Sequence, residues 1–374
     1  MRNIFDARRL GKLLLGVWCA AATAVTYADP WEERGAVYTM SNSPNGNSVI
    51  VFERGPDGRL TRAGEHATGG LGLEGGLGNQ GALALDEDGS RLFVLNAGSD
   101  EISMFLVRGT NLRLVQKVSS GGDRPVSLTV DDDVLYVLNA GSDSIKGFRL
   151  TWWAGITPIP RSSRPLSGTG TDPAQISFSP DGRTLVVTEK ATNNLALFGV
   201  DDWGRPTRGL MVVPSAGATP FGFGFNGRRQ LIVSEAFGGA AGQSAVSSYV
   251  LGRDGSLGVV SASVPTGQTA ACWIVATPDR RFAYTTNTGS GTISGYRAGP
   301  GGTLTRFDDG GVTANLGAGS GPIDMALSQD GDFLYALNGG SQTITLMRVG
   351  HDGTLAIVEA FGGLPPGANG LVAF

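Results

Sequence analysis

Cysteine and histidine are scarce in this sequence, which has two residues of each among 374. The cysteines are Cys19 and Cys272, and the histidines are His66 and His351. A disulfide framework needs paired cysteines, and a transition-metal site needs a cluster of Cys and His ligands. The sequence therefore predicts neither a disulfide-stapled fold nor a metal centre, and no motif in it indicates a bound cofactor.

Charged residues are also few. Asp, Glu, Lys and Arg make up 17% of the chain, the net charge is −4, and no run of basic residues follows the N-terminal segment. Surfaces that bind nucleic acid or anionic lipid carry clusters of Lys and Arg. We therefore expect neither nucleic acid nor a membrane surface as a partner of the mature chain.

The one long apolar run covers residues 13–25 and follows Arg8, Arg9 and Lys12. It is shorter than the roughly 20 residues that a membrane-spanning helix needs. A positive start, a short apolar core and small residues before a cleavage point are typical of a secretory signal peptide. We therefore expect residues 1–28 to be a signal peptide, residues 29–374 to be a single domain, and the protein to be exported, either to a periplasm or out of the cell.

Helical periodicity is absent, whereas glycine is abundant, with 59 residues. Segments with the same pattern recur at intervals of about 50 residues, which indicates a repeat architecture. Six copies are clear, at residues 90–102, 134–145, 183–195, 230–246, 281–293 and 332–344, and a degenerate seventh lies at 36–54. One position of the repeat is occupied by Asn96, Asn139, Glu189, Glu235, Asn287 and Asn338.

Each repeat contains four short apolar or alternating segments that are separated by turn residues. In one copy, residues 175–178 precede Pro180-Asp181-Gly182, and Asp-Gly supplies the positive φ that a tight hairpin needs. Four short strands per unit and even spacing are typical of a propeller blade. The sequence therefore predicts an all-β fold, a seven-bladed β-propeller with four-stranded antiparallel blades.

The two ends of the chain predict how the ring closes. The first repeat begins at its second strand, and the C-terminal residues 369–374 resemble an innermost strand without followers. We expect the C-terminal strand to join the first blade, because closure removes the sheet edges that an open array exposes.

Residues 173–189 and 321–338 resemble blades of the lactonase-type seven-bladed propellers, a family that contains the propeller form of 6-phosphogluconolactonase and the fungal carboxymuconate lactonising enzymes. The resemblance spans essentially the whole mature chain. It implies a site at one mouth of the central channel, marked in the family by a Pro-Arg-His run and an Asn-Glu pair. Glu189 matches the position of that Glu, but Pro173 is followed by Ala174 and Gln175, so the family's histidine base is missing.

Glu189 and Glu235 are the candidate catalytic residues. A carboxylate replaces Asn at two consecutive repeats, and two neighbouring carboxylates tend to split their pKa values, so that one acts as a general base. The alternative is structural, because carboxylates and amides at this position also cap backbone N–H groups of the Gly-rich loops.

Five further residues are candidates for substrate binding: Arg124, Asp172, Gln175, Trp273 and Asp324. Arg124 and Asp172 precede innermost strands, and a guanidinium suits a carboxylate-bearing substrate, although the two residues can equally form a plain surface pair. Gln175 and Trp273 take the position of the family's histidine. Trp273 can alternatively fill core space between blades.

Two functions remain open at this point. The first is an exported hydrolase or cycloisomerase that acts on a small lactone or sugar-derived acid at the channel mouth. The second is a non-catalytic extracytoplasmic propeller, a binding or scaffold module that kept the fold without the family's His and Arg. The expected partner is accordingly a small lactone or organic acid, or an extracytoplasmic protein, and the expected state is a monomer.

Overall fold

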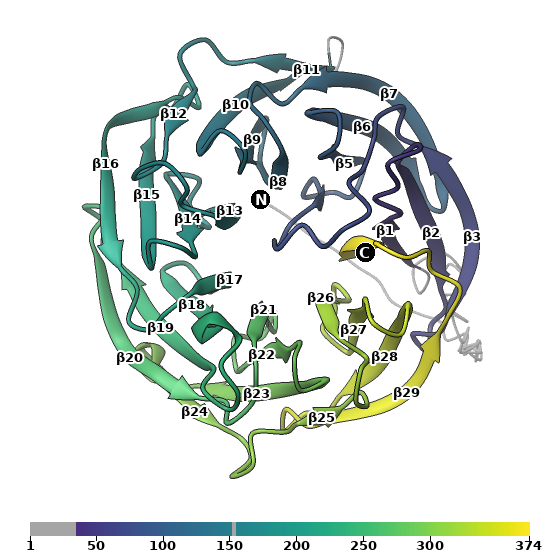
Figure 1. Ribbon diagram of the computed structural model, residues 1–374, viewed down its shortest axis with the longest axis vertical. Helices are drawn as coiled ribbons and strands as arrows, with labels where there is room; N and C mark the ends of the chain where they lie inside the picture. The colour runs from purple at the N-terminus through teal and green to yellow at the C-terminus, as the bar shows by residue number, and fades with distance from the viewer. Residues whose placement is uncertain (1–34, 152–154) are drawn as a thin grey trace, which may run out of the picture. The chain divides into compact units, whose positions relative to one another are not determined.

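The computed structural model describes residues 35–151 and 155–374, which form seven antiparallel β-sheets. Figure 1 shows these sheets as blades set around a common axis, in the order of the chain. The predicted signal peptide, residues 1–28, lies outside the described residues. Among the described residues, no helix has the length and apolar character needed to cross a membrane.

The strands of blades 1 to 4 follow one another from the axis of the ring outward. Blade 1 contains β30 (Asn369–Ala373), β1 (Gly35–Met40), β2 (Ser48–Arg54) and β3 (Leu60–Ala67). Blade 2 contains β4 (Leu83–Leu85), β5 (Arg91–Asn96), β6 (Glu101–Arg108) and β7 (Asn111–Ser119). Blade 3 contains β8 (Pro125–Asp131), β9 (Val134–Asn139), β10 (Ser144–Thr151), β11 (Gly155–Pro158) and β12 (Arg164–Pro165). Blade 4 contains β13 (Pro173–Phe178), β14 (Thr184–Glu189), β15 (Asn194–Val200) and β16 (Pro206–Pro214).

Blades 5 to 7 complete the ring. Blade 5 contains β17 (Pro220–Asn226), β18 (Gln230–Glu235), β19 (Ala245–Leu251) and β20 (Leu257–Pro265), with a 3-10 turn η1 (Phe237–Gly239). Blade 6 contains β21 (Ala271–Ala276), β22 (Phe282–Asn287), β23 (Thr292–Ala298), β24 (Leu304–Arg306) and β25 (Ala314–Asn315), with a 3-10 turn η2 (Pro300–Gly302). Blade 7 contains β26 (Pro322–Leu327), β27 (Phe333–Asn338), β28 (Thr343–Val349) and β29 (Leu355–Phe361).

The predicted closure is confirmed. The C-terminal strand β30 pairs with β1, with Leu371 opposite Thr39 and Val372 opposite Tyr38. Each innermost strand contacts the innermost strand of the next blade, and β30 lies between β26 and β4. The first and last strands of the described chain therefore share one sheet, and the described propeller has no open side between its first and last blades.

The four-strand prediction is confirmed in five blades and needs one correction in the other two. In blades 3 and 6 the outermost strand is divided, so that β11 and β12 both pair with β10, and β24 and β25 both pair with β23. In blade 3 the division falls at Pro158 and Pro160, which cannot donate to a strand ladder. In blade 6 it falls at a turn that contains Gly310 and Gly311.

Buried tyrosines connect neighbouring blades. Four second-strand tyrosines donate their hydroxyl groups to a glycine carbonyl in the outer hairpin turn of the next blade, at 2.7 to 2.8 Å: Tyr38 to Gly109, Tyr136 to Gly204, Tyr284 to Gly353 and Tyr335 to Gly58. The Tyr136 ring also packs edge-on against Phe178 of blade 4, with ring centroids 5.7 Å apart. Each such hydroxyl is satisfied, so burial of the ring carries no penalty for an unpaired polar group.

Candidate functional site

The starts of the innermost strands and the loops after the second strands lie together on one face, which we call the strand-start face. This is where the sequence predicts the channel mouth. The strand register shows the geometry in blade 4, where Pro173 at the start of β13 pairs with Glu189 at the end of β14. The predicted equivalence of the repeat position is confirmed, because all six residues end second strands and are buried: Asn96, Asn139, Glu189, Glu235, Asn287 and Asn338.

The Glu189 carboxylate is buried and bound by its own blade and the connection that enters it. It accepts hydrogen bonds from the Ser167 backbone N–H at 3.0 Å, from the Ser167 hydroxyl, and from the Thr192 hydroxyl at 2.7 Å. Ser167 lies on the connection from blade 3, and Thr192 lies in the loop after β14. Glu189 therefore anchors two loops of the strand-start face.

The Glu235 carboxylate has an equivalent arrangement in blade 5. It accepts hydrogen bonds from the Gly217 N–H at 2.8 Å, from the Ser247 hydroxyl at 2.5 Å and from the Ser263 hydroxyl at 2.7 Å. Burial raises the pKa of this carboxyl, and the hydrogen bonds from Ser247, Ser263 and Gly217 oppose that rise. The donors come from the incoming connection and from β19 and β20, which places the carboxylate inside the blade.

No hydrogen-bond partner among the described residues is shared by Glu189 and Glu235. Each carboxylate has both oxygens occupied by donors from its own blade and from the connection that enters that blade, which is the contact pattern of the structural alternative. The further donors differ, because Glu189 is also bound from the loop that follows its strand, whereas Glu235 is also bound from β19 and β20. The catalytic role of the two residues stays a prediction.

Arg124 and Asp172 are held at the strand-start face by an unusual backbone conformation. Both have positive φ, 49° and 47°, immediately before an innermost strand. Their carbonyl oxygens accept hydrogen bonds from the residue after the second strand, Ala140 in blade 3 and Lys190 in blade 4. The surface pair between Arg124 and Asp172 that the sequence left open does not form in the described chain. Asp172 pairs instead with the Lys190 ammonium at 3.4 Å. The Arg124 guanidinium has no hydrogen bond or ion pair with the described part of the chain.

Lys190 is the functional candidate that the sequence prediction did not include. Its ammonium donates to the Gly78 carbonyl at 2.7 Å and lies 4.9 Å from the centre of the Phe221 ring. Burial lowers the pKa of Lys190, the Asp172 charge opposes this, and the nearby Arg124 charge lowers it further. A signal was present in the sequence, because the equivalent residue is small in the other five clear copies: Ala97, Ala140, Ala236, Thr288 and Gly339.

Gln175 and Trp273 lie on innermost strands, as predicted, but Gln175 is fully engaged. Its side-chain amide donates to the Phe223 carbonyl at 2.9 Å and accepts from the Phe223 N–H at 2.6 Å, so it links β13 to β17. Trp273 is 4% exposed and packs on Phe221, with ring centroids 5.0 Å apart. Its indole N–H has no partner among the described residues. Roles in substrate binding stay predictions for both.

Asp324 lies on β26 of blade 7, whereas Asp172 and Lys190 adjoin strands of blade 4. It is 3% exposed and accepts hydrogen bonds from the Met325 N–H at 2.8 Å and from the Leu371 N–H of β30 at 3.0 Å. Burial raises the pKa of this carboxyl to about 8, against the effect of the two hydrogen bonds. Asp324 thus joins blade 7 to the closing strand of blade 1, and a contact with substrate stays a prediction.

The Gly-rich connection between β3 and β4 crosses the axis of the propeller. Gln80 donates from its side-chain amide to the Ile274 carbonyl at 2.8 Å and accepts from the Ile274 N–H at 3.1 Å, while its backbone N–H donates to Ala174. This one residue therefore contacts the innermost strands of blades 4 and 6. In Figure 1 the connection is the dark blue segment that reaches the middle of the ring. The same connection supplies the Gly78 carbonyl that holds Lys190.

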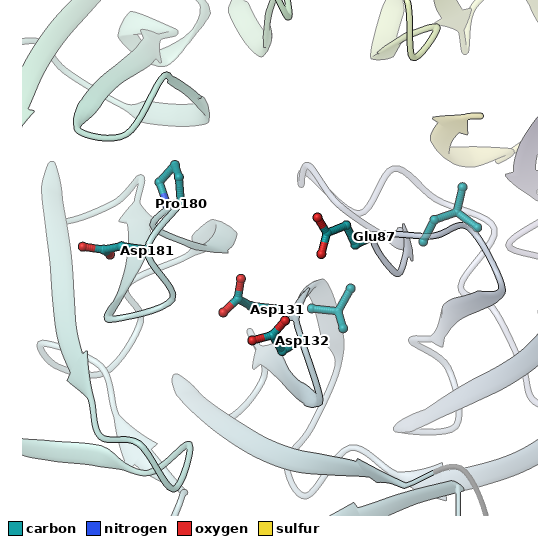
Figure 2. Close-up of a pocket in the computed structure, with 7 residues that line it drawn as sticks. Glu87, Asp131, Asp132, Pro180 and Asp181 are labelled. Atoms are coloured by element: carbon teal, nitrogen blue, oxygen red, sulfur yellow. The ribbon is translucent and has the colours of Figure 1, made fainter. Parts of the chain in front are cut away.

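The opposite, strand-end face carries a cavity of about 500 Å³. Figure 2 shows Glu87, Asp131, Asp132 and Asp181 around it, on the hairpin turns of three consecutive blades. Burial raises the pKa of Asp131, and the charges of Asp132, Glu87 and Asp181 add to that rise. Among the described residues, no group of three or more Asp, Glu, His or Cys side chains has the arrangement of a metal site.

Fold and sequence together define the class of protein. A family model described as "Lactonase, 7-bladed beta-propeller" matches residues 31–155 and 240–372, which is more than half of the chain. The chain belongs to this family. The matched ranges leave out residues 156–239, which contain Asp172, Glu189, Lys190 and Glu235.

Solved structures agree with this class. A candidate 6-phosphogluconolactonase from Bacteroides fragilis superimposes with a TM-score of 0.74 at 16% identity, covering 92% of this chain and 98% of that one. The periplasmic gluconolactonase PpgL of Pseudomonas aeruginosa gives a TM-score of 0.68 at 18% identity, covering 90% and 98%. At these identities the likeness shows the fold alone. A search of curated proteins gives no match.

Proposed function

We propose that this protein hydrolyses a small lactone at the strand-start face, between Asp172 and Lys190. Family membership supports lactone chemistry, and the pair supplies the two groups that the reaction needs. The observation that carries the proposal is the ion pair itself, in which the Asp172 side chain is 56% exposed and the Lys190 side chain is 10% exposed. A base that is open to water thus lies beside a cation in a low-dielectric setting.

The proposed reaction begins with a water molecule held by the Asp172 carboxylate. The water oxygen attacks the lactone carbonyl carbon, and Asp172 takes a proton from the water in the same step. The Lys190 ammonium stabilises the negative charge that forms on the carbonyl oxygen, and a fixed cation near apolar Phe221 is more effective than one in bulk water. The ring C–O bond then breaks, and the leaving oxygen takes the proton that Asp172 carries. The product is the ring-opened hydroxy acid.

Arg124 completes the proposed site. Its guanidinium lies close enough to Lys190 to affect its pKa and has no ion-pair partner in the described chain. Its charge also lowers the pKa of the Asp143 carboxyl, but no carboxylate of the described chain lies within ion-pair distance of it. A planar guanidinium that is not bound in this way suits a substrate carboxylate. We therefore propose that the lactone carries an acidic substituent.

The test compares Asp172→Asn with Asp132→Asn, a matched change at the strand-end face. Purified protein is assayed for hydrolysis of a panel of sugar and aliphatic lactones with a pH-indicator readout. Asp172→Asn should lower the rate by about 100-fold or more, the range of a lost general base, and Asp132→Asn should leave it unchanged. Equal rates in Asp172→Asn and the unmodified protein would overturn the assignment. A large loss in Glu189→Gln or Glu235→Gln, with stability preserved, would favour those carboxylates instead.

A binding or scaffold function is the second candidate, and one observation favours it. His66 lies on the outermost strand β3 and His351 lies in a turn, so neither histidine is near the axis. A propeller without the family's histidine base can keep the binding surface and lose the reaction. An inactive protein that still binds hydroxy acids in calorimetry would support this function.

We also propose that the protein is exported after cleavage before Asp29. The proposal is supported by the positive start, the apolar run and the small residues before Asp29 in the N-terminal segment. Expression with the full N-terminus and N-terminal sequencing of the extracytoplasmic protein tests it. A protein retained inside the cell with residues 1–28 intact would contradict export.

A further inference from the structure

The peptide bond between Gly78 and Asn79 lies directly beside the proposed catalytic cation. The Gly78 carbonyl accepts a hydrogen bond from the Lys190 ammonium at 2.7 Å, and a Cβ atom at Gly78 would lie 3.0 Å from that nitrogen. The Lys190 side chain is only 10% exposed, so a substrate oxygen reaches the ammonium by replacing a group that already lies there. Asp172 is the proposed base and Phe221 is buried, which leaves the Gly78 carbonyl as the group to be replaced.

The chain on both sides of this peptide bond is held in place. Leu77 is buried in the core cluster of blades 1 to 3. The buried Asn79 side chain donates to the Val126 carbonyl, and Gln80 is bound to the innermost strands of blades 4 and 6. The whole connection therefore cannot lift from the strand-start face without breaking these contacts. Rotation of the single Gly78–Asn79 peptide plane, by contrast, leaves the flanking contacts in place.

The two residue types permit this rotation. Rotation of a peptide plane by about half a turn changes ψ of the residue before it and φ of the residue after it. Gly78 has a φ of 63°, a region in which glycine meets no penalty from a Cβ atom. Asn79 has a negative φ in this structure and takes a positive φ after the rotation, which Asn tolerates better than most residues.

The rotation brings the Asn79 backbone N–H to the side of Lys190, because the C=O and N–H groups of one peptide plane point in opposite directions. This N–H has no hydrogen bond within the described chain, although Asn79 is only 1% exposed. Buried backbone N–H groups are nearly always paired, so an unpaired one needs an explanation. The rotation loses no hydrogen bond of this N–H and gives it the chance of a partner at the site.

We propose that the Gly78–Asn79 peptide is a two-state part of the site that binds the oxyanion, an inference that rests on the proposed hydrolysis. When no anion is bound, the Lys190 ammonium attracts the Gly78 carbonyl and repels an N–H group, so the carbonyl faces it. An oxygen that carries negative charge binds the ammonium and the Asn79 N–H together, which favours the rotated state. Two donors then hold the oxyanion of the tetrahedral intermediate in place of one.

The structural test uses the unmodified protein and needs no turnover. Crystal structures are determined without ligand and at saturating gluconate, a ring-opened hydroxy acid whose carboxylate supplies the negative oxygen. Without gluconate the Gly78 carbonyl should face Lys190. With gluconate, one carboxylate oxygen should lie within hydrogen-bond distance of both Lys190 Nζ and the Asn79 nitrogen. A Gly78 carbonyl that still binds Lys190 at saturating gluconate would overturn the proposal.

The kinetic test compares Asn79→Gly with Asn79→Ala. Both lose the side-chain bond to Val126, but only glycine takes a positive φ without penalty, so kcat and kcat/KM should both be about tenfold lower in Asn79→Ala than in Asn79→Gly. Gly76→Ala is the matched control, because a Cβ atom there meets nothing within 4 Å, and it should leave both constants unchanged.

The outcomes separate this inference from the proposed function. Equal constants in Asn79→Gly and Asn79→Ala, in a protein that hydrolyses lactones, would overturn the role of the peptide and leave the hydrolysis standing. A protein that hydrolyses no lactone would overturn the proposed function, and the structures with and without gluconate would still decide whether an anion rotates the peptide.

Discussion

Asp324 allows a quantitative prediction about how pH affects the closure of the ring. Its carboxyl is buried between β26 and the closing strand β30, and the groups that bind it are the Met325 and Leu371 N–H groups. No cation contacts it among the described residues. The change to make is Asp324→Asn, which keeps the size of the side chain and an acceptor oxygen but cannot ionise.

The magnitude follows from the pKa. Burial raises it from 3.8 to about 8, so between these pH values the folded protein holds a proton that the unfolded chain has lost. Stability of the native protein should therefore fall as pH rises from about 4 to about 8. A shift of this size corresponds to at most about 6 kcal/mol, and partial relaxation of the site makes about 3 to 6 kcal/mol the expected range.

The assay is thermal unfolding at pH 5 and pH 9 for the native protein, Asp324→Asn and Asp332→Asn, an exposed control in the same blade. Between pH 5 and pH 9 only the part of this window above pH 5 is sampled, about 3 to 4 kcal/mol, which for a domain of this size corresponds to roughly 4 to 6 °C in Tm. Between pH 5 and pH 9, the Tm of the native protein and of the control should fall by that much more than the Tm of Asp324→Asn. Any constant effect of the amide cancels in this comparison. Parallel pH dependence in all three proteins would refute the reasoning.

Three other predictions concern stability. Glu235→Gln should lower the free energy of unfolding at pH 7 by about 1 to 3 kcal/mol in urea denaturation, because an amide N–H₂ group then faces one of the three donors that bind the carboxylate. Unchanged stability would contradict the anchoring role. Deletion of residues 369–374 should cost at least about 3 kcal/mol, since it removes buried Leu371 and opens blade 1, and an unaltered calorimetric transition would contradict closure by β30. Tyr335→Phe should lower the free energy of unfolding by about 1 kcal/mol, because it removes the hydrogen bond to the Gly58 carbonyl, and Phe333→Leu is measured beside it. Equal stability of Tyr335→Phe and the native protein would argue against this link between blades.

The architecture was predictable because it is written in local, repeated patterns. Asp-Gly turns such as Asp181-Gly182 predict hairpins, and Gly182 has the expected positive φ of 67°. Similar patterns at regular intervals predict the number of blades, and the unmatched C-terminal strand predicts closure. The divided outer strands of blades 3 and 6 were not predicted, because their pieces are short, four residues in β11 and three in β24, and so carry little pattern.

The site was predictable only in part. Arg124 and Asp172 were identified by their place before innermost strands, but the partner of Asp172 is Lys190, and that contact also depends on where the Gly78 connection runs. A loop that crosses the axis and contacts residues nearly 200 positions away, as Gln80 does with Ile274, leaves no local pattern. The comparison of repeats did contain the signal for Lys190, since a charged residue there replaces a small one.

The most direct measurement of the central claim is a crystal structure with a cyclic lactam, an analogue of the lactone that resists hydrolysis. The account predicts that the lactam binds at the strand-start face, with its carbonyl oxygen within hydrogen-bond distance of Lys190 Nζ and its ring against Phe221. Density for the lactam at the cavity of Glu87 and Asp131, or a lactam carbonyl oxygen that lies beyond hydrogen-bond distance of Lys190 Nζ, would contradict it.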